Sequence, residues 1–172
     1  MTYLRRLIWY IASRLLIVCC VLGLLIMAFY FSMNATNIYI ILKDGMAKRA
    51  QVVMMGEEAD LTSYFSQACL DRDQKLNEAL NGQSAYQNNY NITGFDHRIS
   101  LDSFWCWPWD DTAQATVTER IPAIDGKIKS SARDNDQVQE LEWQTVRYSV
   151  LLTRENGQWH VKNLTALQVI EE

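Results

Sequence analysis

The N-terminal segment constrains this 172-residue chain most, because it contains an apolar stretch long enough to cross a membrane. The stretch runs from Leu7 to Phe31 and is interrupted only by Arg14. About 20 apolar residues in a helix span the hydrocarbon core of a bilayer. The uninterrupted part from Leu15 is longer than the core of a signal peptide, and no cleavage site of small residues follows it. The sequence therefore predicts an uncleaved anchor that contacts the lipid bilayer through residues 7–31.

Basic residues flank this stretch only on its N-terminal side. Arg5, Arg6 and Arg14 lie there, and the next basic residue is Lys43. Positively charged flanks stay in the cytoplasm, so we expect a single-pass protein of the cell membrane with a cytoplasmic N-terminus and its C-terminal domain outside. Of the 16 basic residues, three lie before the outer part, whereas all 20 acidic residues lie within it. The outer part therefore has a formal charge of −7 (16 − 3 − 20). That charge argues against nucleic acid as a partner.

The part after the anchor divides into a stalk and one domain. Residues 1–33 are assigned to the cytoplasmic N-terminus and the anchor, and residues 34–55 keep apolar positions at helical spacing, which predicts a helical stalk. Residues 56–172 are enough for one extracytoplasmic domain with its own core. The domain begins with GEEADLTSYFSQACLDRDQKLNEALNG, whose acidic first turn, apolar face and terminal Gly82 predict an amphipathic helix.

From Phe95 onward the hydrophobic pattern alternates with a period of two, which is typical of β-strands. Two long alternating segments joined at Asn156-Gly157 predict a hairpin. Three further strands are predicted before it, over residues 95–109, 112–121 and 124–132. Helices followed by a run of strands with short turns indicate an α+β fold, in which helices pack on one face of an antiparallel sheet of four to five strands.

The outer domain resembles a known superfamily. An opening helix like DLTSYFSQAC and a final hairpin of the form VRYSVLLTRENGQWHVKNLTAL are similar to the nuclear-transport-factor-2-like superfamily over residues 56–169. The resemblance implies a curved sheet that wraps its helices into a cone. A single membrane pass before such a domain is the layout of assembly-factor subunits of type IV secretion and conjugation machines, and it also occurs in membrane proteins of endospore-forming bacteria.

This layout implies a scaffolding or protein-interaction domain in a bacterial cell-envelope complex, serving secretion, conjugation or sporulation. The expected partner is another protein or a second copy of the chain. The absence of a recognisable catalytic constellation favours this hypothesis over an enzyme.

Residues with catalytic or metal-binding potential are few. The only histidines are His97 and His160, and the chain has no H-x-H, C-x-x-C, phosphate-loop or G-x-S-x-G motif. We therefore expect no metal site, no cofactor and no enzymatic activity. The competing hypothesis is a membrane-tethered enzyme or small-ligand binder that uses the cavity of the cone, because some members of the superfamily place an Asp, His or Tyr there for proton transfer. Tyr148 and His97 would then be the cavity residues.

The segment DSFWCWPWDD contains three of the six tryptophans, Trp105, Trp107 and Trp109. They continue the odd-numbered face that begins at Phe95, which predicts that they lie in the core near the end of a strand. The alternative is an exposed aromatic platform for a peptide, a glycan or a neighbouring subunit, in which Asp110 also contacts the partner. The platform would lie at the mouth of the cone, and a bulge near Ser103 is an open alternative for the strand that carries the three tryptophans.

The end of this segment carries turn signals. Pro108 cannot donate to a central ladder, so the strand is expected to leave the sheet there. Asp110 and Asp111 are adjacent and would point to opposite faces of a strand, which argues against a pair of catalytic carboxylates. An Asx-type turn is the expected structure.

Overall fold

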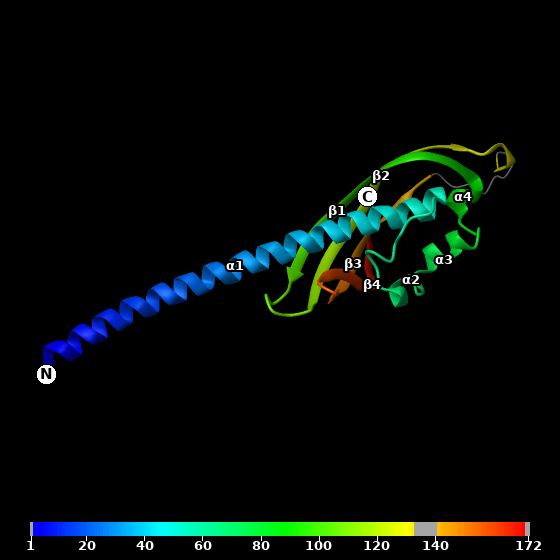
Figure 1. Cartoon of the computed structure of the whole chain (residues 1–172). Helices are drawn as coiled ribbons and strands as arrows, with labels where there is room; N and C mark the ends of the chain where they lie inside the picture. The colour runs from blue at the N-terminus through cyan, green and yellow to red at the C-terminus, as the bar shows by residue number, and fades with distance from the viewer. Residues whose placement is uncertain (1, 133–140, 171–172) are drawn as a thin grey trace.

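The computed structural model describes residues 2–132 and 141–170, and its first element is one continuous helix. α1 (Thr2–Met55) has 54 residues, so at about 1.5 Å per residue it is roughly 80 Å long. Its N-terminal half stands clear of the domain (Figure 1), and its apolar side chains from Leu15 to Phe29 are exposed. Within the described residues it is the one helix long and apolar enough to cross a membrane, as the sequence predicted.

The C-terminal half of α1 is the central helix of the domain. Ile38, Leu42, Met46 and Ala50 recur every four residues and are at most 1% exposed, so they form one buried stripe of the helix. The helix ends at Met55. Residues 34–55 are therefore helical, as predicted for a stalk, but they lie inside the core of the domain instead of separating it from the anchor.

Four antiparallel strands form an open sheet in the order β1-β2-β3-β4. They are β1 (Tyr90–Trp105), β2 (Thr112–Ile128), β3 (Trp143–Glu155) and β4 (Gln158–Ile170). Figure 1 shows the strands bending along the C-terminal half of α1, with α3 (Gln74–Leu80) and α4 (Ala85–Asn89) near the end of that helix and α2 (Gln67–Leu70) beside β4. The α+β class is confirmed. The sheet is not closed, and the cone implied by the resemblance stays a prediction.

The separate strand predicted over residues 124–132 does not exist. Residues 112–128 form the single strand β2, which pairs with β1 along almost its whole length, and a 3-10 turn, η1 (Ser130–Ala132), follows. Pro122 is tolerated within β2 because it lies in a bulge of β2 opposite β1 and just beyond the end of pairing with β3, so no partner needs its missing N–H.

The predicted hairpin is confirmed in its turn as well as in its strands. β3 and β4 pair from Glu155 and Gln158 onward, and the two residues between them have φ of 52° at Asn156 and 83° at Gly157. Positive φ at both central positions defines the type I′ turn that the Asn-Gly sequence favours.

The amphipathic helix predicted for residues 56–82 is replaced by the two short helices α2 and α3. Phe65 forms a parallel bridge with Val161 of β4, and backbone hydrogen bonds on both sides of Phe65 hold it there. The Tyr64 carbonyl accepts from the Val161 N–H and the Ser66 N–H donates to the Val161 carbonyl, so these two groups are not free to continue a helix through this point. Asp73 then starts α3 by accepting a hydrogen bond from the Leu76 N–H at 3.2 Å.

Candidate functional site

Charged side chains are buried between α1, the start of α3 and the inner face of the sheet. Arg49 of α1 is 4% exposed, and its Nε and Nη2 donate to the two carboxylate oxygens of Asp73, the second bond being 3.0 Å long. Arg49 Nη1 lies 3.9 Å from Oε2 of Glu119, a β2 residue with no exposed surface. We call the group the buried charge cluster, and its members are Arg49, Asp73, His97, Glu119, Trp143 and Tyr148.

Neighbouring strands supply the other partners of Glu119. His97 Nε2 of β1 lies 3.2 Å from Oε1, and the indole N–H of Trp143 donates to Oε2 at 3.4 Å. Burial, with the negative charge of Glu119, raises the pKa of Tyr148 to about 12. Burial alone would lower the pKa of Arg49, but the hydrogen bonds and charge of Asp73, with Glu119, raise it above its ordinary value. Arg49 thus lies between Asp73 and Glu119 inside the domain, hydrogen-bonded to Asp73, while its Nη1 is buried near Glu119 without a hydrogen-bond partner.

The structure brings together the two residues predicted to line a cavity. His97 and Tyr148 both belong to the buried charge cluster, and neither is among the residues that line the acidic pocket described below. No group of three or more His, Cys, Asp or Glu side chains in residues 2–132 and 141–170 has a metal-binding arrangement. The arrangement therefore joins helix to sheet through polar side chains.

Sequence reasoning missed Arg49, Asp73 and Glu119, although two of them left a signal. Glu119 shares the inward parity of the apolar residues from Ala113 to Ile121 on β2. Arg49 lies among the core positions of α1 close to Met46. A charged residue in an otherwise apolar register indicates a buried ion pair, because an unpaired charge at such a position is strongly destabilising.

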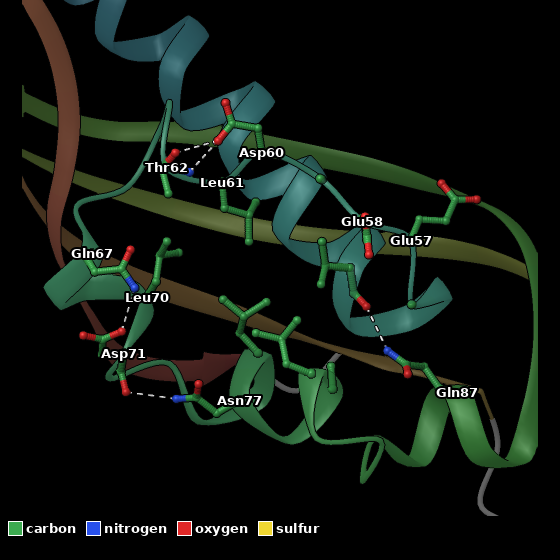
Figure 2. Close-up of a pocket in the computed structure, with 16 residues that line it drawn as sticks. Glu57, Glu58, Asp60, Leu61, Thr62, Gln67, Leu70, Asp71, Asn77 and Gln87 are labelled. Atoms are coloured by element: carbon green, nitrogen blue, oxygen red, sulfur yellow. Dashed lines mark hydrogen bonds between the residues drawn. The ribbon is translucent and has the colours of Figure 1, made fainter.

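An open pocket of about 600 Å³ lies between the C-terminal end of α1, the segment that follows it, and α2 and α3 (Figure 2). We call it the acidic pocket. Its apolar lining includes Leu61, Leu70 and Leu76, and the side chain of Leu80 is 68% exposed at its edge. Four carboxylates line it and no Lys or Arg does. They belong to Glu57, Glu58, Asp60 and Asp71.

The carboxylates of the acidic pocket keep their negative charge unneutralised. None of them forms an ion pair with a basic side chain in the described part of the chain. Asp60 accepts hydrogen bonds from the hydroxyls of Ser63 and Thr62, which lower its pKa to about 2. Glu57 and Asp71 accept hydrogen bonds from neutral glutamine side chains. The C-terminal end of α1 adds its negative dipole, so the pocket attracts cations.

The three tryptophans are exposed, which contradicts the prediction that they lie in the core. A register shift between Leu101 and Ser103 inserts an extra residue into β1, and such a bulge exchanges the two faces of the strand. Beyond it Cys106 is buried, whereas Trp105, Trp107 and Trp109 are 58%, 41% and 69% exposed.

We call Trp105, Trp107 and Trp109 the aromatic turn. The ring of Trp107 stacks on Trp109 at 5.4 Å with an interplanar angle of 16°, and it meets Trp105 edge to face at 5.3 Å. The turn closes when the Asp110 N–H donates to the Trp107 carbonyl at 3.1 Å, so backbone atoms make it, in place of the predicted Asx side chain. The three rings are exposed, as the alternative considered from the sequence requires, and the binding of a partner there stays a prediction.

Comparison with family models, with curated proteins and with solved structures finds no match to this chain. The features of the described chain that bear on its function are the acidic pocket, the aromatic turn and the apolar half of α1.

Proposed function

We propose that the chain is a single-pass membrane protein whose outer domain binds a basic segment of a partner protein in the acidic pocket. The observation that carries the proposal is the lining of that pocket, in which four carboxylates surround apolar residues and no basic side chain balances them. A Lys- or Arg-bearing segment with one apolar side chain complements both features. The N-terminus lies in the cytoplasm in this proposal, as the basic flank of the span indicates.

The position of the acidic pocket supports a partner outside the membrane. Val52 and Gly56 line it at the end of α1 that is farthest from the apolar half of the helix. The exposed edge at Leu80 is accessible to a chain arriving from solvent. The formal charge of −7 on the outer part also steers basic proteins toward the domain.

The process we propose is assembly of a bacterial cell-envelope complex, of the secretion, conjugation or sporulation type. We also propose membership of the nuclear-transport-factor-2-like superfamily. The support is the order of elements, in which a single apolar N-terminal helix is followed by an α+β domain that ends in a long hairpin. We further propose that the domain is not an enzyme. The support is that His97 and Tyr148 are occupied by Glu119 and Arg49 inside the buried charge cluster.

The test is site-specific photo-crosslinking in cells. A photo-reactive phenylalanine replaces Leu80 at the edge of the acidic pocket, and a control replaces Ser100, which is exposed on β1. The proposal expects a crosslinked protein at Leu80 only, attached through a peptide rich in Lys or Arg that mass spectrometry identifies. Capture of a neutral or acidic peptide, or equal capture from Ser100, would refute it.

A charge control makes this test specific. Neutralising Glu57, Glu58 and Asp71 to their amides should abolish the Leu80 crosslink, whereas Asp125→Asn, an exposed acid on β2, should leave it unchanged. The triple variant removes charge inside the acidic pocket, whereas Asp125→Asn removes charge outside it. A crosslink that survives the triple substitution would show that the carboxylates do not hold the partner.

A further inference from the structure

We propose that the aromatic turn inserts into the outer headgroup region of the same bilayer that α1 spans. The inference rests on the membrane-spanning role proposed for α1 and does not depend on the acidic pocket. It assigns Trp105, Trp107 and Trp109 to a lipid surface, a partner that the sequence alone did not suggest. Tryptophan is enriched at membrane interfaces because its ring is apolar while its indole N–H needs a polar partner.

Contacts with α1 place the aromatic turn level with the outer end of the span. Phe104, immediately before it, packs on Phe31 with ring centroids 5.2 Å apart. Cys106, within it, lies next to Asn34, whose Nδ2 is 3.8 Å from the Cys106 sulfur. Phe31 is the last residue of the apolar stretch, and polar residues begin at Ser32. Figure 1 shows the β1–β2 turn beside the helix at the point where α1 leaves the domain.

Both possible positions of the span put this level within the interface. If the hydrocarbon core begins at Leu15, the stretch that ends at Phe31 has about 17 residues, which is within the range that spans a bilayer, and Phe31 lies at the outer edge of the core. If it begins at Leu7, the core ends near residue 26, and Phe31 lies about 7 Å beyond it. The polar headgroup layer is roughly 5–8 Å thick on each side. The aromatic turn therefore meets headgroups in either case.

The height of the aromatic turn is fixed by hydrogen bonds to α1. Arg154 at the end of β3 donates to the side-chain oxygen of Asn34 at 2.7 Å, and its backbone N–H donates to the Asp111 carbonyl at 2.8 Å. These bonds join the turn, the last hairpin and the helix at one level. A rigid connection of this kind holds the domain at one distance and tilt from the membrane, with the acidic pocket at the far end of α1.

The chemistry of the turn favours a neutral lipid surface. Asp110 and Asp111 follow the tryptophans, and residues 105–111 contain no Lys or Arg. Attraction to anionic lipid needs basic residues near the surface. The insertion that we propose therefore depends on the indole rings and takes place in zwitterionic phosphatidylcholine.

The experiment uses the full chain reconstituted in phosphatidylcholine liposomes, with Trp9→Phe as the background so that the span itself carries no tryptophan. Nitroxide lipids labelled near the headgroup should quench most of the emission, and aqueous acrylamide should quench little of it. Trp105→Phe, Trp107→Phe and Trp109→Phe together should remove the lipid-quenched fraction. Trp143→Phe, a buried control, should retain it.

Two outcomes would overturn the proposal. Strong acrylamide quenching without lipid quenching would place the aromatic turn in water, and protection from both quenchers would show that a protein or a second copy covers it. A variant with Trp9 as its only tryptophan separates this failure from failure of the span. If nitroxide lipids quench Trp9 but not the turn, α1 is in the membrane and only the insertion of the turn is wrong.

Discussion

Replacing Arg49 by Met should strongly destabilise the domain, because among the described residues it is the Arg or Lys side chain that pairs with Asp73 and the buried Glu119. Met keeps an unbranched apolar stem in place of the Arg49 stem and removes the guanidinium. At 3.9 Å and an effective dielectric constant of about 20, one ion pair is worth about 4 kcal/mol. Removing one partner of a buried pair costs about 3–5 kcal/mol, since the remaining charge stays desolvated.

The assay is urea unfolding of the full chain in detergent micelles, followed by fluorescence and by far-ultraviolet circular dichroism. The matched control is Arg98→Met on β1. Arg98 pairs with Asp96 at 2.6 Å, but the two side chains are 66% and 45% exposed. Exposed pairs contribute about 0.2–1 kcal/mol, so the control should change the free energy of unfolding by less than about 1 kcal/mol.

A second substitution tests whether the cost comes from an uncompensated charge. Glu119→Gln in the Arg49→Met background should recover stability, because it removes the carboxylate that has lost its ionic partner. Coupling energies between residues in contact are about 0.5–3 kcal/mol. If Arg49→Met costs no more than Arg98→Met, or if the double variant is no more stable than the additive sum of the two single ones, the cluster is not the electrostatic unit that we describe.

Three further predictions concern pH, packing and topology. The pKa of Tyr148 is raised from 10.0 to about 12, so its contribution is complete below pH 10 and is lost as the pH rises through 12; Tyr148→Phe should flatten the fall in stability across that window, and an unchanged slope would contradict the assignment. Gly45→Ala should destabilise the domain by about 1–3 kcal/mol, since a Cβ there would lie 2.9 Å from Tyr64 Cβ, whereas Gly23→Ala meets no atom and should leave urea unfolding unaltered. In intact cells an impermeant maleimide should label Leu80→Cys but not Tyr3→Cys; labelling of both or of the latter alone would reverse the orientation.

Sequence reasoning predicted the features that depend on neighbours along the chain. The apolar stretch up to Phe31 is a property of composition and length, and it is helical throughout. The Asn156-Gly157 turn was equally predictable, because only residues that tolerate positive φ fit its two central positions. The α+β class followed from the change of hydrophobic period near Phe95.

Contacts between distant segments decided the rest. The bridge between Phe65 and Val161 divided the predicted helix, because a hydrogen bond to β4 competes with helical bonds. Arg49 and Glu119, 70 positions apart, became partners only when α1 packed on the sheet. No local sequence pattern predicts such a pairing, because the interaction free energy of the pair depends on both side chains being buried together in the folded domain.

The tryptophans show this division most clearly. Alternation from Phe95 placed Trp105, Trp107 and Trp109 on the inner face, and a single inserted residue after Leu101 placed them outside. A bulge is set by the partner strand and by the packing of Phe104 on Phe31, neither of which the sequence of β1 contains. The sequence by itself determined that an aromatic cluster exists beside a turn. Only the tertiary structure, by fixing register against β2 and α1, decided that the cluster is exposed beside the end of the apolar stretch of α1.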